Sequence, residues 1–222
     1  MIKNLIEIKN KINETDVLFF DLDGTIINTE PLYFRFWKEA SKFYGYELTD
    51  EQALGMRSRD RTSAKEYIER VSNGKLDYVK TREKRTELMN AYFETHQYEI
   101  KPGIVEFLSK SRLNNKKLYI VTANMVDKTE RILKAIKLEN YFDGIISARD
   151  VQRGKPYPFV YLEACRQVNK NPSEVVVFED SPNGLISSFG AGCFTVMIED
   201  MTPYGDDMDY VDGVIESFSN LL

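Results

Sequence analysis

The sequence predicts an α/β fold, built as a doubly wound parallel sheet with a helical insertion. The first observation is a series of five apolar segments with the length of strands, at residues 17–20, 117–121, 144–146, 175–178 and 194–198. The second is that helical patterns lie between the later segments, at residues 103–113, 126–136, 159–168 and 183–189. Strands that alternate with helices of this length are typical of a parallel sheet covered on both faces.

The stretch after the first strand breaks this alternation. Residues 31–96 contain apolar side chains at helical spacing only, as in Leu32, Phe36, Trp37, Ala40 and Phe43. We therefore predict that residues 1–30 and 97–222 form the α/β core domain. Residues 31–96 are predicted to form an α-helical cap domain inserted into it.

The composition indicates a soluble enzyme-sized chain. Its 222 residues carry a formal net charge of −5, which argues against a nucleic-acid partner. The two cysteines, Cys165 and Cys193, lie in apolar contexts and are predicted to be reduced core residues of a cytoplasmic protein. The single histidine, His96, makes a histidine-based nucleophilic mechanism improbable and is interpreted as structural. No feature indicates an obligate interface, so we expect a monomer.

The N-terminal segment is neither a signal peptide nor a membrane span by its pattern. Lysines interrupt it throughout, and it has no continuous apolar run. Its spaced apolar residues predict a short amphipathic helix docked on the body, through Ile2, Leu5, Ile6, Ile8 and Ile12. We expect no membrane partner.

Four short segments carry chemistry that suits a single phosphate site. They are Asp21-Leu22-Asp23-Gly24-Thr25, Val121-Thr122-Ala123-Asn124, Gly154-Lys155-Pro156 and Phe178-Glu179-Asp180-Ser181. Taken singly, each is more commonly a turn, a strand end, a loop or a helix entry. The first, second and fourth all end a predicted parallel strand, which is where open α/β sheets bind ligands. Together they therefore indicate one site.

The acids of these segments require a positive partner. Asp21 and Asp23 are two residues apart, so the alternation of a strand points both side chains the same way. With Glu179 and Asp180 they would form a cluster of four carboxylates that repel one another unless a cation lies among them. Mg²⁺ fits best because it binds one or two carboxylates together with phosphate oxygens. Lys155 adds a compact positive charge suited to phosphate.

In this order the four segments resemble the four motifs of the haloacid dehalogenase superfamily. The β-phosphoglucomutase-like branch is the part that they resemble most. The residues that carry this closer resemblance are Asn28-Thr29-Glu30-Pro31, Arg153-Gly154-Lys155-Pro156-Tyr157-Pro158 and Phe178-Glu179-Asp180-Ser181-Pro182-Asn183-Gly184. The resemblance covers nearly the whole chain from Asp16 onward. It implies a Rossmann-like core, a four-helix cap, Mg²⁺ and phosphoryl transfer through an aspartyl-phosphate.

The resemblance also implies a role for each motif residue. Asp21 would attack phosphorus, and Asp23 would donate a proton to the leaving oxygen and then take one from water or a hydroxyl. Thr122 and the backbone around Ala123 and Asn124 would hold phosphate oxygens, while Lys155 would neutralise charge at Asp21.

The implied metal ligands come from the first and fourth motifs. Asp180, Asp21 and the main-chain carbonyl of Asp23 would bind Mg²⁺. Glu179 would be a further ligand or act through water.

Departures from the mutase pattern favour a phosphatase. The histidine that follows the first motif in sugar phosphomutases corresponds here to Tyr33, and Leu54-Gly55 stands where they carry lysine and glycine. Asn124-Met125-Val126 replaces their Ser-Lys-Asn run. The second acid, Asp23, separates the chain from dehalogenases, which have no leaving alkoxide to protonate. Nothing matches the cap lysine of phosphonate hydrolases.

The loop Gly55-Met56-Arg57-Ser58-Arg59 resembles the substrate-specificity loop of the family. Gly55, Arg57 and Arg59 are therefore candidates for binding a distal phosphate or a sugar hydroxyl. Exposed arginines at the start of a helix are an equally open interpretation.

The sequence thus predicts a Mg²⁺-dependent phosphatase of a small phosphorylated metabolite, most simply a sugar phosphate. The alternative enzyme is a β-phosphoglucomutase. A third hypothesis, a binding protein that keeps the fold without its chemistry, is disfavoured because a binder has no need of a proton donor beside a nucleophile. The identity of the phosphate ester is not encoded in these motifs.

Overall fold

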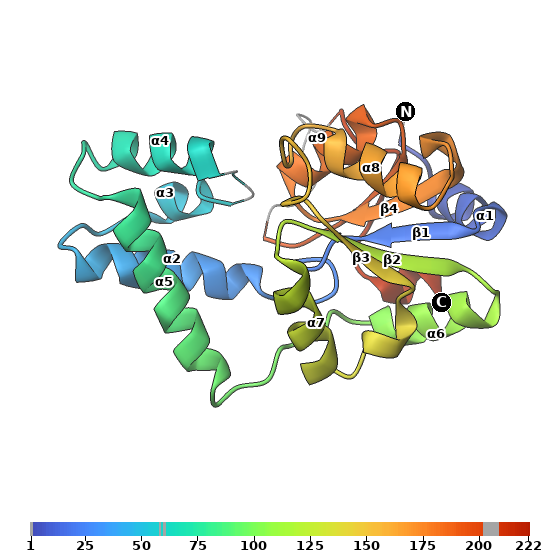
Figure 1. Ribbon diagram of the computed structural model, residues 1–222, viewed down its shortest axis with the longest axis horizontal. Coiled ribbons are helices and arrows are strands. Elements are labelled where there is room, and N and C mark those ends of the chain that lie inside the picture. The colour runs from blue at the N-terminus through green and yellow to red at the C-terminus, as the bar shows by residue number, and fades with distance from the viewer. Residues whose placement is uncertain (1, 58, 60, 202–208) are drawn as a thin grey trace. The chain divides into compact units, whose positions relative to one another are not determined.

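The computed structural model describes residues 2–57, 59, 61–201 and 209–222 (Figure 1). The chain forms two compact units, one made of Met1–Asn28 with Glu99–Leu222 and the other of Thr29–Tyr98. The boundaries between the two units fall at 28/29 and 98/99, each two residues from the predicted boundaries at 30/31 and 96/97. That the second unit acts as a cap stays a prediction.

The larger unit contains a six-stranded parallel sheet with the order β3-β2-β1-β4-β5-β6. Its strands are β1 (Val17–Phe20), β2 (Lys117–Thr122), β3 (Gly144–Ser147), β4 (Val175–Glu179), β5 (Phe194–Ile198) and β6 (Gly213–Ile215). The predicted α/β class is therefore confirmed, and the five predicted strands are present with ends that agree within one residue. The sequence analysis missed β6, because three residues are too short to show a strand period and only pairing with β5 defines this strand.

Helices cover both faces of this sheet (Figure 1). One face carries α8 (Phe159–Gln167) and α9 (Pro182–Gly190), and the opposite face carries α6 (Ile104–Leu113) and α7 (Val126–Ala135). The register pairs Phe20 with Ile120 on one side and with Phe178 on the other. Because these three residues are level, the residues that follow them leave the sheet at the same edge.

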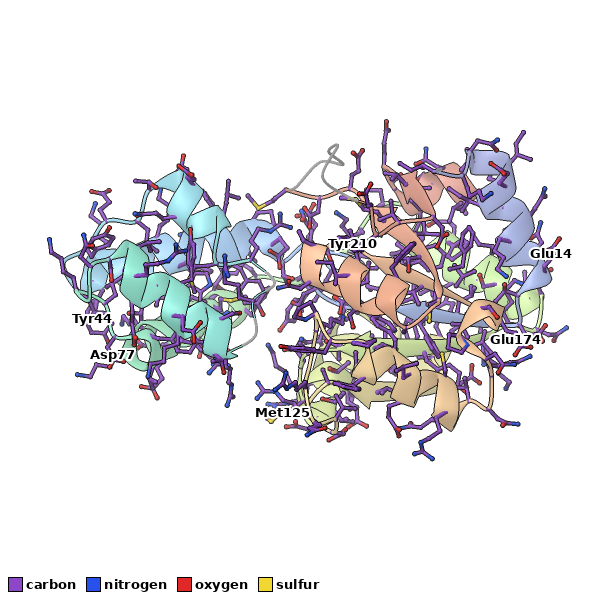
Figure 2. The ribbon with its side chains drawn as sticks, turned by 90° about the horizontal axis from the view of Figure 1, so that it is seen from above. Glu14, Tyr44, Asp77, Met125, Glu174 and Tyr210 are labelled. Atoms are coloured by element: carbon purple, nitrogen blue, oxygen red, sulfur yellow. The ribbon has the colours of Figure 1, made fainter. Side chains whose placement is uncertain are left out.

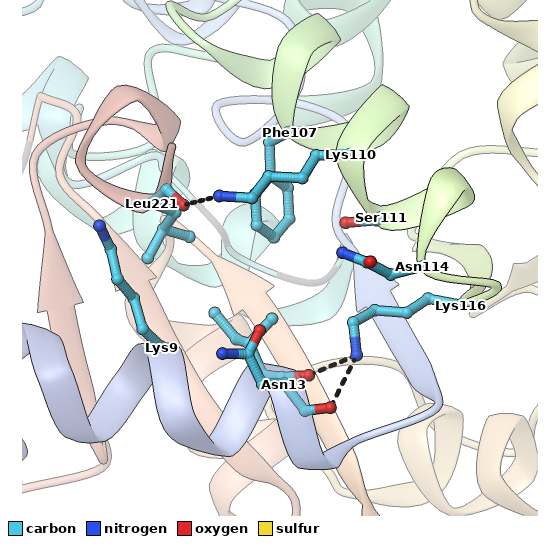
Figure 3. A pocket seen from close by; sticks show the side chains of 9 residues that line it. Lys9, Asn13, Phe107, Lys110, Ser111, Asn114, Lys116 and Leu221 are labelled. Carbon is cyan, nitrogen blue, oxygen red and sulfur yellow. Dashed lines mark hydrogen bonds between the residues drawn. The ribbon is translucent and has the colours of Figure 1, made fainter.

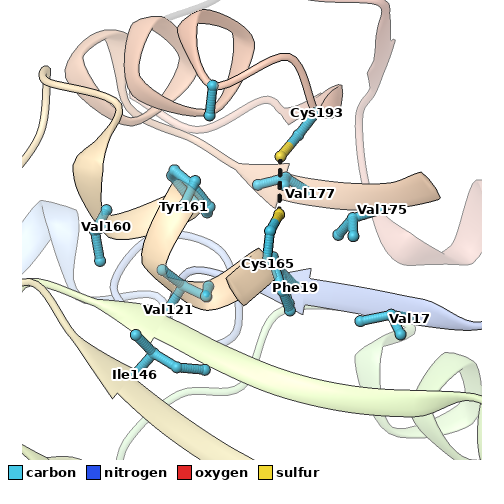
Figure 4. Close-up of a cluster of buried hydrophobic side chains, with 12 residues drawn as sticks. Val17, Phe19, Val121, Ile146, Val160, Tyr161, Cys165, Val175, Val177 and Cys193 are labelled. Atoms are coloured by element: carbon cyan, nitrogen blue, oxygen red, sulfur yellow. Dashed lines mark hydrogen bonds between the residues drawn. The ribbon is translucent and has the colours of Figure 1, made fainter. Parts of the chain in front are cut away.

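Successive residues of β1 pack on opposite faces of the sheet. Phe19 belongs to a buried cluster beneath α8 that includes Val121, Tyr161 and Cys165 (Figure 4). Phe20 stacks on Phe178 on the other face, with ring centroids 5.1 Å apart. This alternation is the period-two geometry of a strand with both faces buried.

Both cysteines are buried and unbridged, as predicted. The Sγ atoms of Cys165 and Cys193 lie 3.9 Å apart in the cluster beneath α8 (Figure 4).

The N-terminal helix α1 (Leu5–Glu14) begins with a capping box in which Asn4 and Glu7 exchange hydrogen bonds. It docks through Ile8 and Ile12, which are buried. The other apolar residues predicted to dock it are exposed, namely Ile2, Leu5 and Ile6. The predicted helix is therefore present, but its buried stripe is narrower than expected.

A buried lysine ties down the end of α1. Lys116 Nζ donates to the main-chain carbonyls of Ile12 (2.6 Å), Asn13 (3.2 Å) and Thr15 (2.5 Å), beside a small pocket (Figure 3). Burial lowers the pKa of Lys116, and Asp16 opposes that shift. The ammonium group thus supplies a donor to three carbonyls at the helix end, of which that of Ile12 also accepts from the Thr15 amide at 3.2 Å.

The described residues of the smaller unit form four α-helices. They are α2 (Glu30–Phe43), α3 (Asp50–Leu54), α4 (Arg61–Val71) and α5 (Tyr78–Phe93). Asp77 caps α5 by accepting a hydrogen bond from the Lys80 amide at 2.9 Å (Figure 2). The unit has its own core, formed by Trp37, Leu48, Ala53, Met56, Ala64, Ile68, Leu76 and Tyr78.

Phe43 departs from the predicted apolar face of α2. It is the last residue of the helix and is 64% exposed, with its ring edge-on to Tyr44 at 5.1 Å. Within the described part of the chain, every helix is too short or too polar to cross a membrane.

Candidate active site

Three acids from two neighbouring strands meet at the carboxyl edge of the sheet. Asp21 follows β1, Glu179 ends β4, and Asp180 follows it. The Asp21 amide donates to the Phe178 carbonyl at 3.0 Å, so the hydrogen bonding between β1 and β4 continues as far as Asp21. All three acids are buried, and one oxygen of each lies within 4.8 Å of the others. The structure therefore brings together three of the four predicted metal-binding acids through their carboxylates.

Lys155 bridges two members of this acidic cluster. Its Nζ donates to Asp21 Oδ1 at 2.6 Å, to Val121 O at 3.2 Å and to Glu179 Oε1. Burial by itself would lower the pKa of Lys155, but Asp21 and Glu179 outweigh that effect and raise it. The ammonium group is therefore charged at neutral pH, as the sequence analysis expected.

One lysine does not balance the acids. Burial is the largest of the effects that raise the pKa of Asp21 to about 8; Lys155 opposes it, and the neighbouring Glu179 and Asp23 add to it. A carboxyl group with this pKa is disfavoured as an anion until more positive charge arrives. Oxygen ligands from several carboxylates are what a hard divalent cation requires, so the acidic cluster fits such a cation by its chemistry.

Two glycines make room for the acids. A Cβ atom on Gly24 would lie 2.1 Å from Asp180 Oδ2, and one on Gly184 would lie 2.0 Å from Glu179 Oε2. Gly24 also has a φ of +81°, in the left-handed region that residues with a side chain rarely adopt. The chain can therefore turn after Asp23 and still pass directly over Asp180.

The second acid of the first motif, Asp23, is held from the next strand. Asn124 Nδ2 donates to Asp23 Oδ2 at 2.6 Å, and Lys128 Nζ donates to Asn124 Oδ1 at 3.0 Å. A lysine can only donate, so it fixes the amide with its oxygen toward Lys128 and its NH₂ group toward Asp23. Lys128 was missed by the sequence analysis. Its position one helical turn beyond Asn124 is the signal that was available.

The loop after β2 is held in place by hydrogen bonds. Thr122 is buried and its Oγ1 accepts from the Asn124 amide at 3.1 Å. Ser147 Oγ, from the end of β3, donates to the Asn124 carbonyl at 2.7 Å. Ala123 is exposed, and its carbonyl accepts from Arg149 Nε at 3.4 Å. The predicted phosphate-binding loop thus lies beside the acids in a defined conformation.

A buried tyrosine completes the site. Tyr161 OH donates to Glu179 Oε1 at 2.6 Å. Burial, with Glu179 adding to it, raises the pKa of Tyr161, so the phenol stays protonated and acts as a donor. The sequence analysis missed this residue because an aromatic side chain within a helical pattern is indistinguishable from core.

The predicted substrate-binding residues of the smaller unit have partners of their own. Arg57 Nε donates to Glu30 Oε2 at 2.7 Å, and both side chains are largely buried. Arg59 is exposed. Its Nε donates to the Gly55 carbonyl at 2.5 Å and its guanidinium group lies 4.2 Å from the centre of the Tyr67 ring.

Arg57 is therefore ion-paired with α2 and is not an exposed helix-start arginine, whereas Arg59 is exposed. Ser58 of the same loop lies outside the described residues. Substrate binding by Gly55, Arg57 and Arg59 stays a prediction.

The motif residues of the larger unit all lie within residues 18–198, which match the family model described as haloacid dehalogenase-like hydrolase. The chain belongs to this family. The resemblance read from the four motifs is thereby confirmed.

Individual members of the hydrolase family are similar over most of their length. A phosphorylated carbohydrates phosphatase of Thermotoga maritima is 28% identical over 184 residues, covering 80% of this chain and 82% of that protein. A validoxylamine A 7′-phosphate phosphatase of Streptomyces hygroscopicus subsp. limoneus is 31% identical over 190 residues, covering 81% and 84%. A crystal structure of β-phosphoglucomutase from Clostridium difficile superposes with a TM-score of 0.78 at 21% identity, covering 94% of this chain and 93% of that one. The last similarity establishes the fold that the two proteins share.

Proposed function

We propose that this hydrolase is a Mg²⁺-dependent phosphatase of a small phosphorylated metabolite, most simply a sugar phosphate. The observation that carries the proposal is the arrangement of side chains around Asp21. The charged Lys155 donates to Asp21, and the buried Glu179 and Asp180 lie close to it. The second aspartate of the motif, Asp23, is oriented by the Asn124 amide. Two relatives support the substrate class, since their names describe phosphatases of phosphorylated carbohydrates and of validoxylamine A 7′-phosphate.

The cation would be held by the buried acidic cluster. Asp21, Asp180 and Glu179 would supply carboxylate oxygens, and Asp23 would supply its main-chain carbonyl. Mg²⁺, when bound there, supplies positive charge that offsets the acids and the phosphoryl oxygens.

In the first step Asp21 acts as the nucleophile. One of its carboxylate oxygens bonds to phosphorus while the bond from phosphorus to the leaving oxygen breaks, which leaves an aspartyl-phosphate. Asp23 gives its proton to the leaving oxygen, so that an alcohol departs. Lys155 keeps a positive charge against the reacting oxygens, where charge stabilisation is most valuable.

In the second step Asp23 acts as a base. It takes a proton from a water molecule whose oxygen attacks phosphorus, and the bond between phosphorus and Asp21 breaks. Inorganic phosphate leaves, and both aspartates return to their starting states. The Asn124 amide supports this step because a donor to Asp23 Oδ2 fixes the orientation of the carboxyl group. Thr122 and the backbone of Ala123 and Asn124 would bind phosphate oxygens.

The experiment is a phosphate-release screen over sugar phosphates and other small phosphoesters with Mg²⁺, with and without a chelator. Asp21→Asn is expected to abolish release, while the exposed Asp16→Asn serves as the matched control and is expected to retain it. β-Glucose 1-phosphate with a bisphosphate activator is assayed in parallel. Isomerisation without release would replace the phosphatase by a mutase, and full activity of Asp21→Asn would refute the mechanism.

A further inference from the structure

A phenol hydroxyl points out of an apolar cluster toward the acidic site. Tyr161 is completely buried on α8, with its ring in the cluster that contains Val121 and Cys165 (Figure 4). A phenylalanine would fill the same space without burying a polar group. Among the residues that the structure describes, the hydroxyl has one hydrogen-bond partner, Glu179 Oε1, at 2.6 Å. A phenol that donates to a carboxylate at this distance makes a strong hydrogen bond.

Glu179 is held on both of its oxygens. Oε1 accepts from Tyr161 and from Lys155, while Oε2 accepts from the Ser181 hydroxyl at 3.2 Å. Gly184 lies directly against Oε2, where no side chain could fit. Oε1 thus accepts from two close donors, while Oε2 has one more distant donor, and an oxygen of this carboxylate lies within 4.8 Å of oxygens of Asp21 and Asp180.

We propose that Tyr161 is a positioning residue that fixes the orientation of the Glu179 carboxylate at the cation site. The inference rests on the proposed function only for the identity of the cation, Mg²⁺. Hydrogen-bond partners of metal ligands orient those ligands, and their loss commonly weakens metal binding about 10–100-fold. Without the phenol, Lys155 is the one donor to Oε1 that remains among the described residues, and the carboxylate is held less firmly.

The variant that tests this proposal is Tyr161→Phe, which removes one oxygen atom and keeps the ring in the core. Its matched control is Tyr119→Phe. Tyr119 packs against the same cluster, and its hydroxyl has no hydrogen-bond partner among the described residues. The two variants therefore differ in the contact to Glu179 and not in the chemical change made.

The measurement is the melting temperature of the purified protein, without substrate, over a series of Mg²⁺ concentrations. A cation that binds only the folded state raises the melting temperature as its concentration passes the dissociation constant. We expect Tyr161→Phe to need about 10–100 times more Mg²⁺ for the same rise. Tyr119→Phe is expected to match the wild type. A packing role alone would lower the melting temperature at every Mg²⁺ concentration without moving this midpoint.

A double-mutant cycle adds a second test. In a Glu179→Gln background, Tyr161→Phe should shift the Mg²⁺ midpoint no further, because the residue through which it acts is already changed. A midpoint for Tyr161→Phe within twofold of the wild type, an undiminished second shift in the Glu179→Gln background, or a wild type that does not respond to Mg²⁺ would each overturn the proposal. Absence of phosphatase activity, with the Mg²⁺ midpoints as expected, would refute the proposed function alone.

Discussion

Replacing Lys155 by methionine is expected to destabilise the metal-free protein strongly. The lysine side chain is 9% exposed and forms ion pairs with Asp21 and Glu179, whose side chains are 11% and 0% exposed. Removing one partner of a buried ion pair leaves an uncompensated charge and typically costs about 3–5 kcal/mol. For a chain of this length each kcal/mol lowers the melting temperature by about 2–4 °C, so the expected decrease is about 6–20 °C.

The assay is thermal unfolding of Lys155→Met in the presence of a chelator, at pH 8 and at pH 5. The loss should be smaller at pH 5, because Asp21, whose pKa is raised to about 8, is protonated there and leaves less uncompensated charge. Lys170→Met is the matched control. It breaks the exposed pair with Asp16, which contributes little, so its melting temperature should stay near that of the wild type. A decrease below about 2 °C for Lys155→Met would refute the reasoning that this buried pair is held by charge.

Two further predictions concern the end of α1 and the pH dependence of stability. Lys116→Met leaves three main-chain carbonyls without their shared donor, so we expect a loss of about 2–3 kcal/mol in urea unfolding and faster amide exchange in α1. An unchanged unfolding midpoint would show that water replaces the ammonium group. The pKa of Asp21 is raised in the folded state, from 3.8 to about 8, so the native protein binds this proton more tightly than the unfolded chain. Stability in chelator should therefore fall as pH rises from about 4 to 8. Mg²⁺ should reduce that fall, and the Asp21→Asn variant should lack it in thermal unfolding.

The parts of the fold that the sequence predicted are those with strong local periodicity. The strands β1 and β4 are buried on both faces, so they appear as continuous apolar runs in the sequence. Phe43 departs from this periodicity. Its spacing matches the apolar face of α2, but it is the last residue of the helix, where the side chain extends beyond the core of its unit.

The candidate site was predictable where chemistry is concentrated in short motifs. Asp21, Asp23, Lys155 and Asp180 are polar residues at the ends of apolar strands or in a loop, and that contrast marks them in the sequence. Tyr161 and Lys128 carry no such contrast, since an aromatic residue or a lysine is ordinary in a helix. Tyr161 contacts Glu179 only because the fold brings together residues that are 18 positions apart. Lys128 contacts Asn124 only because the loop that contains Asn124 lies against the helix that contains Lys128.

The sequence by itself determined the α/β class, the helical insertion and the acids and lysine of the site, because periodicity and the order of motifs are local properties. Only the tertiary structure decided how charge is distributed among them. Depth of burial raises the pKa of Asp21, and the three donors that converge on Glu179 come from separate segments of the chain. Electrostatic interactions and burial depend on distances in space, which the spacing of residues along a chain does not specify.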